Sequence, residues 1–281
     1  MLTLEQFIDQ ALREDIGDGD HTTLACVDGN KTGTAEIIAK ENGTIAGIVL
    51  ADQIFTRFDP SLVVNTLVND GEKVATGKVC ISVSGKIRSI LTCERLVLNC
   101  LQRMSGIATH THQMCLQLSG LKTKILDTRK TTPLFRMMEK WAVKIGGGEN
   151  HRFGLFDMVL IKNNHIDSAS GIIHVIRSAN EYLKKNNKKL NVVIETRNLE
   201  EVKEVLRIGG VHRILLDNFS PVQLSEAVNF INHRFETEAS GKITLENVRQ
   251  YAETGVDYIS VGALTHSYKS MDISLRIRKT V

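Results

Sequence analysis

The chain has 281 residues, of which 42% are hydrophobic and 24% carry a charge, a composition typical of a folded protein with one large domain or two ordinary ones. The formal net charge of only +3 argues against a protein that binds nucleic acid by neutralising many phosphates. Five cysteines without a CxxC pair indicate neither a disulfide framework nor a zinc ribbon, and they favour a reducing compartment.

The first expected element is a short amphipathic helix over residues 2–14, where apolar residues recur at helical spacing. This start lacks the basic region and long apolar core of a secretory signal. No apolar run approaches the roughly 18 residues that are needed to cross a bilayer. We therefore expect a cytoplasmic protein that does not interact with membranes.

Between residues 33 and 91 the pattern changes to short apolar runs separated by Asn-Gly, Asp-Gly, Thr-Gly and Ser-Gly pairs, which mark tight turns. The expected strands are residues 34–40, 44–50, 62–68 and 78–87. They predict a compact antiparallel sheet. A long helix should follow over residues 91–118, with Gly106 as a candidate break point.

After residue 121, brief apolar runs each end in polar or charged residues, and amphipathic helices lie between several of them. The runs are residues 122–130, 156–165, 190–198, 211–219, 234–241 and 256–264. The clearest helices are 198–210 and 220–233, the second with Ser220 as its N-cap and Pro221 in its first turn. Alternating strands and helices predict a parallel α/β domain.

The ends of these runs favour a barrel over an open sheet, because functional side chains of a βα barrel sit at the carboxyl ends of several strands. The residues at these ends are Asp127, Arg129, Lys130, Lys162, Glu195, Asp217, Asn218, Glu238, Ser240 and Gly262. Contact with water explains any single one of them equally well. Polar groups or glycine at six consecutive ends favour a functional barrel mouth.

The segment from Arg129 to Lys162 contains seven Lys or Arg residues against three acids. If neighbouring strand ends meet, five residues of this segment converge on one pocket: Arg129, Lys130, His151, Arg152 and Lys162. Arginine forks and lysine charges together suit a small polyanion. The alternative is a solvated surface patch, which we prefer for Arg136, Lys140 and Lys144 because their spacing indicates an exposed helical stripe.

Two carboxylates, Glu195 and Asp217, end successive strands and should project into the same mouth, about one strand spacing apart. Such a pair suits Mg²⁺, which takes few protein carboxylates and completes its shell with waters and phosphate oxygens. Structural salt bridges with the basic residues are the alternative.

Glycine-containing loops 238–244 and 260–267 follow the last two expected strands, where βα barrels commonly hold phosphate groups. The triple-glycine segment 145–151 is more simply a flexible loop. The sequence has no GxSxG motif and no cysteine beside these strand ends, so we do not expect a covalent nucleophile.

Several motifs together resemble the quinolinate phosphoribosyltransferases, the carboxylating nicotinate-nucleotide pyrophosphorylases of NAD biosynthesis. The motifs are TRKTTP, GGGENHRFGL, MVLIKNNH, LLDNF, EASG, YISVGALTHS, REDIGDGDHTT and DGEKVATGKV with ERLVLNCLQRMSGIAT. The resemblance covers nearly the whole chain. It implies an N-terminal α/β sandwich domain over residues 1–115, joined by the C-terminal segment 268–281, and an open α/β barrel over residues 116–267.

The resemblance also implies a reaction and an assembly. Quinolinate and phosphoribosyl pyrophosphate would give nicotinate mononucleotide, pyrophosphate and CO₂, with Mg²⁺ as cofactor. The subunits would form a homodimer in which the sandwich of one subunit caps the barrel of the other.

Individual positions carry roles by the same resemblance. Quinolinate-binding positions match Arg129, His151, Arg152 and Lys162, together with Arg103 delivered by the partner subunit. The catalytic positions match Lys130, at the junction of the two substrates, and Glu195 and Asp217, which serve the ribose hydroxyls and the metal. The 5-phosphate positions match Ser240, Gly241, Gly262 and His266. Departures from the family pattern occur at Leu134, Asn163 and Val193, which stand where glycine, aspartate and glutamate are usual.

Two other functions fit part of this pattern. A related phosphoribosyltransferase-like protein associated with molybdenum transport shares the fold and would act on another acceptor, but the full basic set argues against it. A non-catalytic protein that binds small anions needs the phosphate loops but has no use for the pair of Glu195 and Asp217.

Overall fold

The computed structural model describes residues 2–278, whose contacts divide them into two compact units. The first unit comprises the residues up to His112, Thr132–Gly147 and the segment from Tyr268 onward, and the second comprises Gln113–Thr131 and Gly148–Ser267. Thr132–Gly147 thus belongs to the first unit, although it lies inside the range expected for the barrel. Residues 279–281 of the expected C-terminal segment lie outside the described residues.

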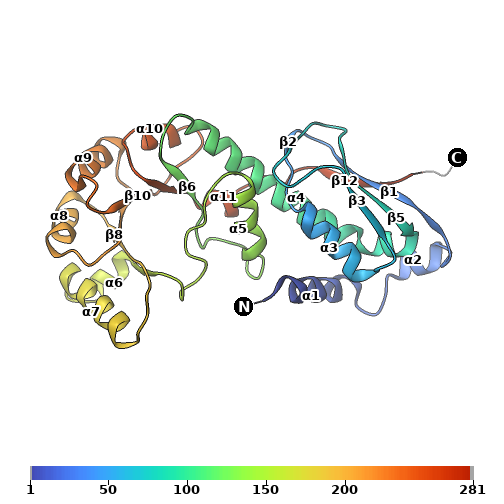
Figure 1. Cartoon of the computed structure of the whole chain (residues 1–281), viewed down its shortest axis with the longest axis horizontal. Coiled ribbons are helices and arrows are strands. Elements are labelled where there is room, and N and C mark those ends of the chain that lie inside the picture. Colours follow the sequence, from blue (N-terminus) through green and yellow to red (C-terminus); the bar gives the residue numbers. More distant parts are fainter. Residues whose placement is uncertain (1, 279–281) are drawn as a thin grey trace. The chain divides into compact units, whose positions relative to one another are not determined.

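The first unit contains a four-stranded antiparallel sheet in the order β12-β1-β5-β3 (Figure 1). Its elements are α1 (Leu4–Ile16), α2 (His21–Cys26), β1 (Thr32–Ala39), β2 (Gly43–Thr44), α3 (Ile48–Phe58), β3 (Val63–Thr66), β4 (Lys73–Val74), β5 (Val79–Lys86), most of α4 (Ile87–Gln117), α5 (Arg136–Ile145) and β12 (Ile273–Ile277). Because β12 pairs antiparallel with β1, the end of the chain completes the sheet formed near its start.

The strand expected over residues 44–50 is wrong for most of its length, since α3 begins at Ile48. Gly47 adopts a left-handed φ of 98°, and the Oδ1 atom of Asp70 accepts hydrogen bonds from the backbone N–H groups of Gly47 and Ile48 at 2.6 and 2.9 Å. This long-range cap satisfies donors that a helix start leaves open. The apolar run therefore continues as a buried helix rather than a strand.

Helix α4 runs unbroken through Gly106, so the candidate break is not observed. A Cβ atom at this position would overlap the carbonyl group of Lys269, and the glycine therefore permits close packing. The same helix buries Val97, Leu101 and Met104. In this case a helix-weakening residue is retained for a tertiary contact.

The second unit is an α/β structure built on a six-stranded sheet in the order β6-β11-β10-β9-β8-β7, with every pair parallel. Its elements are β6 (Lys124–Leu126), β7 (Val159–Ile161), α6 (Asn163–Asp167), α7 (Ile172–Lys185), β8 (Val192–Thr196), α8 (Leu199–Ile208), β9 (Arg213–Asp217), α9 (Pro221–Ile231), β10 (Glu236–Ser240), α10 (Val248–Ala252), β11 (Tyr258–Ser260) and α11 (Ala263–His266). Among the described residues β6 and β7 do not pair, which leaves the sheet unclosed.

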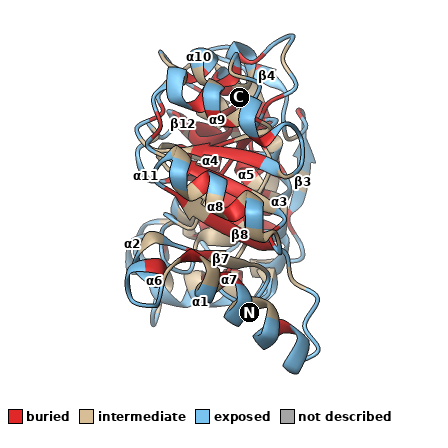
Figure 2. Cartoon of the chain, turned by 90° about the vertical axis from the view of Figure 1, so that its left-hand side faces the viewer, coloured by how far each residue is buried: buried red, intermediate tan, exposed pale blue. Residues whose placement is uncertain are grey.

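The predicted helices on this sheet are confirmed. Helix α9 begins as expected, because Ser220 accepts a hydrogen bond from the backbone of Gln223 and Pro221 occupies the first turn. Figure 1 shows α7, α8, α9 and α10 in an arc around the strands, and Figure 2 shows β8 in the colour of buried residues. Helices cover the outside of the sheet, so the strand ends are the positions at which polar groups reach a cavity.

No helix in the part of the chain that the structure describes is both long enough and apolar enough to cross a membrane.

Candidate functional site

A cavity of about 850 Å³ opens at the carboxyl ends of the six parallel strands, entirely within the second unit. It brings together eleven of the site residues expected from the sequence: Arg129, Lys130, His151, Arg152, Lys162, Glu195, Asp217, Ser240, Gly241, Gly262 and His266. The expected Arg103 does not line this cavity and belongs to the first unit. Strand-end placement thus assembled the pocket that the sequence indicated.

Arginines form one side of the cavity. Arg152 is only 8% exposed, and its Nη1 atom donates a hydrogen bond to the carbonyl oxygen of Met158 at 3.2 Å. Burial, and then the positive charge of Arg129, lower the pKa of the Arg152 guanidinium. Two nearby guanidinium groups, one of them buried, create a positive potential that an anion with two negative charges would relieve.

The loop that carries Arg152 is fixed on both sides. Before it, the carboxylate of the buried Asp127 accepts hydrogen bonds from the backbone of His151 at 2.8 Å and the side chain of Asn150 at 2.5 Å. After it, Asp157 accepts from the backbone N–H groups of residues 153 and 154. The loop is therefore held by side chains and not by regular secondary structure.

Glu195 and Asp217 lie on the neighbouring strands β8 and β9, as expected. The Oε1 atom of Glu195 accepts from Asn163 at 2.6 Å, while its Oε2 atom lies 3.6 Å from the Lys162 ammonium group. Burial raises the pKa of Glu195, the charge of Asp217 adds to this rise, and Lys162 opposes it. The salt bridge that the sequence left open as an alternative is therefore observed at Glu195.

Asp217 is oriented by its own partners, with Oδ1 accepting from Ser240 at 2.6 Å and Oδ2 from Asn218 at 2.8 Å. No cluster of three or more His, Cys, Asp or Glu side chains suited to a metal ion occurs within residues 2–278. A pair of oriented carboxylates nevertheless fits Mg²⁺, because this ion is usually held by one or two carboxylates, waters and substrate phosphate oxygens.

The glycine loops approach the cavity closely. Gly241 has a left-handed φ of 101°, and a Cβ atom there would overlap the side chain of Asn218. A Cβ atom on Gly262 would lie 2.8 Å from the Lys130 side chain and 3.1 Å from His266 Nε2. Both positions thus leave no room for a side chain, and both glycines line the cavity, where phosphate-binding loops commonly place glycine.

Sequence reasoning missed three polar residues that line the cavity, Thr128, Lys242 and Thr244, and it placed Asn218 and Glu238 at the strand ends without giving them a role. Lys242 stands out because it is a non-glycine residue with a φ of 53° beside the glycine loop. Its position directly after a glycine at a strand end was the available signal. Glu238 was noted only as a polar residue on its strand, although it is fully buried.

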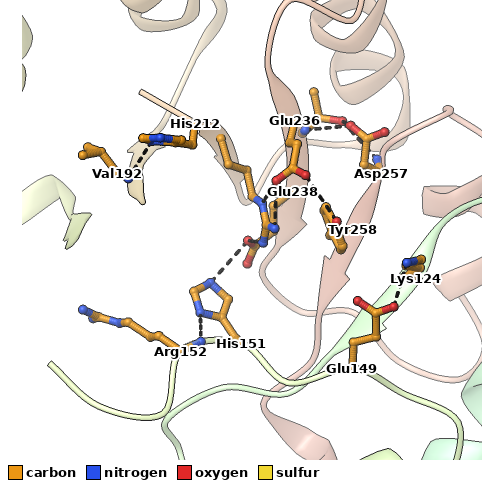
Figure 3. A network of polar contacts seen from close by, with 12 residues as sticks. Lys124, Glu149, His151, Arg152, Val192, His212, Glu236, Glu238, Asp257 and Tyr258 are labelled. Carbon is orange, nitrogen blue, oxygen red and sulfur yellow. Dashed lines mark hydrogen bonds and ion pairs between the residues drawn. The ribbon is translucent and has the colours of Figure 1, made fainter. Parts of the chain in front are cut away.

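Figure 3 shows a network of polar contacts around His151 and Glu238, two residues that line the cavity. Glu238 lies 3.3 Å from His151 Nε2 and accepts from Arg213 at 2.9 Å. Arg213 also pairs with Glu236 at 3.0 Å, and its guanidinium carbon lies 3.9 Å from the centre of the Tyr258 ring. The network connects three neighbouring strands to the loop that carries Arg152.

The expected exposed stripe on α5 is wrong at Lys140, and Arg136 is only half-exposed. Lys140 is only 3% exposed, whereas Lys144 is exposed as predicted. The helix buries Met138, Ala142 and Val143, and the side of the helix that carries them also takes in Lys140. Helical spacing alone did not determine how much of α5 is covered.

Comparisons with known proteins agree over nearly the whole chain. Residues 20–105 match the quinolinate phosphoribosyl transferase N-terminal domain, and residues 107–276 match the C-terminal domain of the same family. A quinolinate phosphoribosyltransferase (decarboxylating) 1b of Nicotiana tabacum and a chloroplastic nicotinate-nucleotide pyrophosphorylase (carboxylating) of Arabidopsis thaliana are each 48% identical, over 98% of this chain and 82% of theirs.

The fold agrees as well. A crystal structure of nicotinate-nucleotide pyrophosphorylase from Ehrlichia chaffeensis superposes with a TM-score of 0.92 at 38% identity, covering 99% of both chains. The unclosed parallel sheet with an N-terminal antiparallel sheet is thus the architecture of solved relatives, which confirms the expected fold class. The chain belongs to the quinolinate phosphoribosyltransferase family.

Proposed function

We propose that the protein transfers a phosphoribosyl group from phosphoribosyl pyrophosphate to quinolinate and decarboxylates the product, forming nicotinate mononucleotide, pyrophosphate and CO₂. The observation that carries this proposal is the cavity at the strand ends, where a basic side adjoins two carboxylates and two glycine loops. Quinolinate has two adjacent carboxylates, which match the excess of positive charge. The names of the relatives point to the same reaction.

In this mechanism the basic residues bind and orient the acceptor. Arg129, Arg152 and Lys162 pair with the quinolinate carboxylates and point the ring nitrogen toward the ribose. Fixing two reactants in an attack geometry removes much of the entropic barrier. Pyrophosphate leaves as positive charge develops on the ribose, and Lys130 stabilises the departing negative charge. The ring nitrogen forms the new bond to the ribose carbon that pyrophosphate leaves, and its positive charge then favours loss of the neighbouring carboxylate as CO₂. The electron pair of the broken bond stays on the ring carbon, which takes a proton from water.

Glu195 and Asp217 would hold Mg²⁺ and contact the ribose hydroxyls. When bound, the ion would neutralise charge on the pyrophosphate. The 5-phosphate would be bound by backbone and side-chain donors of Ser240, Gly241, Gly262 and His266. His151 is also assigned to the quinolinate subsite.

Arg103 is assigned to the site of a partner subunit in a homodimer. In the first unit its Nη2 atom donates to Thr132 at 2.8 Å and to the buried Glu139 at 3.1 Å. Its guanidinium carbon lies 5.4 Å from the ring centres of both Phe135 and Tyr268. Two hydrogen bonds and two aromatic rings thus fix the orientation of the Arg103 guanidinium, which supports a role that requires a positioned arginine. The cytoplasmic location remains a prediction.

The test is an assay of the purified protein with quinolinate, phosphoribosyl pyrophosphate and Mg²⁺, following CO₂ and nicotinate mononucleotide. We expect turnover with quinolinate, none with nicotinate as acceptor, and loss of activity when the metal is chelated. Binding of both substrates without any product would favour the non-catalytic alternative. Turnover only with an acceptor other than quinolinate would favour the transferase associated with molybdenum transport.

A further inference from the structure

Two buried side chains, His151 and Glu238, link the loop of Arg152 to the sheet (Figure 3). The side chain of His151 is 7% exposed and that of Glu238 is fully buried. Glu238 comes from the middle of β10, whereas His151 lies in the irregular loop before β7. The contact therefore joins a rigid element to a segment that has little regular structure of its own.

The hydrogen bonds of His151 define where its proton lies. The backbone N–H of Arg152 donates to the Nδ1 atom of His151 at 2.7 Å, so Nδ1 acts as an acceptor and carries no proton. The ring proton is then on Nε2, which faces the Oε2 atom of Glu238 at 3.3 Å. Each ring nitrogen thus has a partner inside the protein.

Glu238 is suited to fix this arrangement because it stays ionised. Burial by itself raises the pKa of Glu238, whereas the hydrogen bond from His151 and the charge and hydrogen bond of Arg213 lower it, and the pKa lies below its ordinary value. An ionised carboxylate only accepts hydrogen bonds, so it requires the proton on Nε2. Arg213 in turn is held by Glu236 and by the ring of Tyr258.

We propose that Glu238 is a positioning residue for the subsite of the two quinolinate carboxylates, which comprises Arg129, Arg152 and Lys162. Glu238 fixes the orientation and tautomer of His151. The His151 ring in turn holds the backbone of Arg152, so that the Arg152 guanidinium faces quinolinate. The proposal deepens the proposed function and rests on it only in taking quinolinate as the ligand. It gives His151 a supporting task, through Nδ1, beyond the substrate contact assigned to it by resemblance.

The first experiment compares Glu238→Gln with Glu236→Gln by calorimetric binding of quinolinate. Both variants remove one carboxylate from Arg213, but only Glu238 contacts His151. We expect Glu238→Gln to weaken quinolinate binding about tenfold, as one charge-assisted hydrogen bond is lost, and to leave the affinity for phosphoribosyl pyrophosphate within about twofold. Glu236→Gln should leave both affinities unchanged. Equal quinolinate affinities in the two variants would overturn the proposal.

A double-mutant cycle tests whether Glu238 acts through His151. If it does, the pair of Glu238→Gln and His151→Ala should bind quinolinate no more weakly than His151→Ala alone. Additive losses would show that Glu238 acts by another route and would overturn the proposal. If Glu238→Gln does not fold, Glu238→Asp serves instead, because it keeps the charge and shortens the side chain away from His151.

Nuclear magnetic resonance separates this inference from the proposed function, because it needs no substrate. The ¹⁵N signals of His151 should show an unprotonated Nδ1 and a protonated Nε2 in the free protein. The backbone amide signal of Arg152 should shift in Glu238→Gln and stay in place in Glu236→Gln. A protonated Nδ1, or an unmoved amide, would refute the positioning role. A wild-type protein with the expected signals but no affinity for quinolinate would refute the proposed ligand alone.

Discussion

The ammonium group of Lys162 lies 3.6 Å from the Oε2 atom of Glu195, so one of the basic residues forms an ion pair with one of the two carboxylates. Asn163 occupies the other oxygen of Glu195 at 2.6 Å. The basic side of the cavity and the carboxylate pair are therefore adjacent and electrostatically coupled. A change of charge at Lys162 should therefore alter the pKa of Glu195.

This coupling predicts that kcat/KM falls on the acid side of its pH profile. Because the pKa of Glu195 is raised by burial and by Asp217, its carboxylate takes up a proton at a higher pH than an ordinary glutamate. Protonation would remove a proposed ligand of Mg²⁺, so kcat/KM for phosphoribosyl pyrophosphate should fall as pH drops through this raised value. Lys162→Ala should move this fall to higher pH, since the charge of Lys162 opposes the rise.

Stability should show the opposite pH dependence. In the window between the ordinary and the raised pKa, the folded protein binds the proton of Glu195 more tightly than the unfolded chain, so this residue adds stability as pH falls. Glu195→Gln should therefore match or exceed the wild type in free energy of unfolding at neutral pH while losing activity. A marked loss of stability at neutral pH, measured by urea unfolding, would contradict the assignment.

Removing one cation from the basic side should weaken quinolinate binding. Arg152→Ala and Lys162→Ala should each cost about 1.5 to 3 kcal/mol, because each leaves a carboxylate without its charged hydrogen-bond partner. That corresponds to roughly a 10- to 150-fold loss of affinity in calorimetry. Lys144→Ala, which removes an exposed cation of α5 outside the cavity, is the matched control and should bind normally. Unchanged quinolinate binding by both Arg152→Ala and Lys162→Ala would contradict the assignment of these residues to quinolinate.

The proposed site built from two subunits predicts complementation between inactive variants. Arg103→Ala should inactivate although Arg103 does not line the cavity. After mixing and subunit exchange with Arg152→Ala, each heterodimer would contain one intact site, and activity should recover to about a quarter of that of the wild type. Activity that stays at the level of the separate variants would argue against a site built from two subunits.

Leu134 predicts a gain in stability. This residue is 75% exposed and has a left-handed φ of 63°, a conformation that costs a non-glycine residue roughly 1 to 2 kcal/mol. Glycine relieves the strain but loses more chain entropy, so Leu134→Gly should raise the free energy of unfolding by up to about 1 kcal/mol. Both variants are compared with the wild type by thermal unfolding. Leu134→Ala keeps the strain and should show no gain in stability.

Local patterns in the sequence determined the order of strands and helices in the second unit. The start of α9 follows from a serine cap and a proline whose effects extend over only a few residues. The strand ends followed from short apolar runs, and the rule that parallel strands present their carboxyl ends together brought Glu195 and Asp217 to one edge. The positions in the family motifs then supplied roles that spacing alone does not give.

The tertiary structure determined the features that depend on contacts between residues distant in sequence. The cap that Asp70 provides turned the expected strand near Ile48 into a helix, and contact with Lys269 explains a glycine inside an unbroken α4. Likewise, nothing near His151 in the sequence indicates that its Nε2 atom faces the carboxylate of Glu238. Hydrogen bonds and packing between remote segments form only when the chain folds, and their free energy exceeds the small local preferences that a sequence pattern reports.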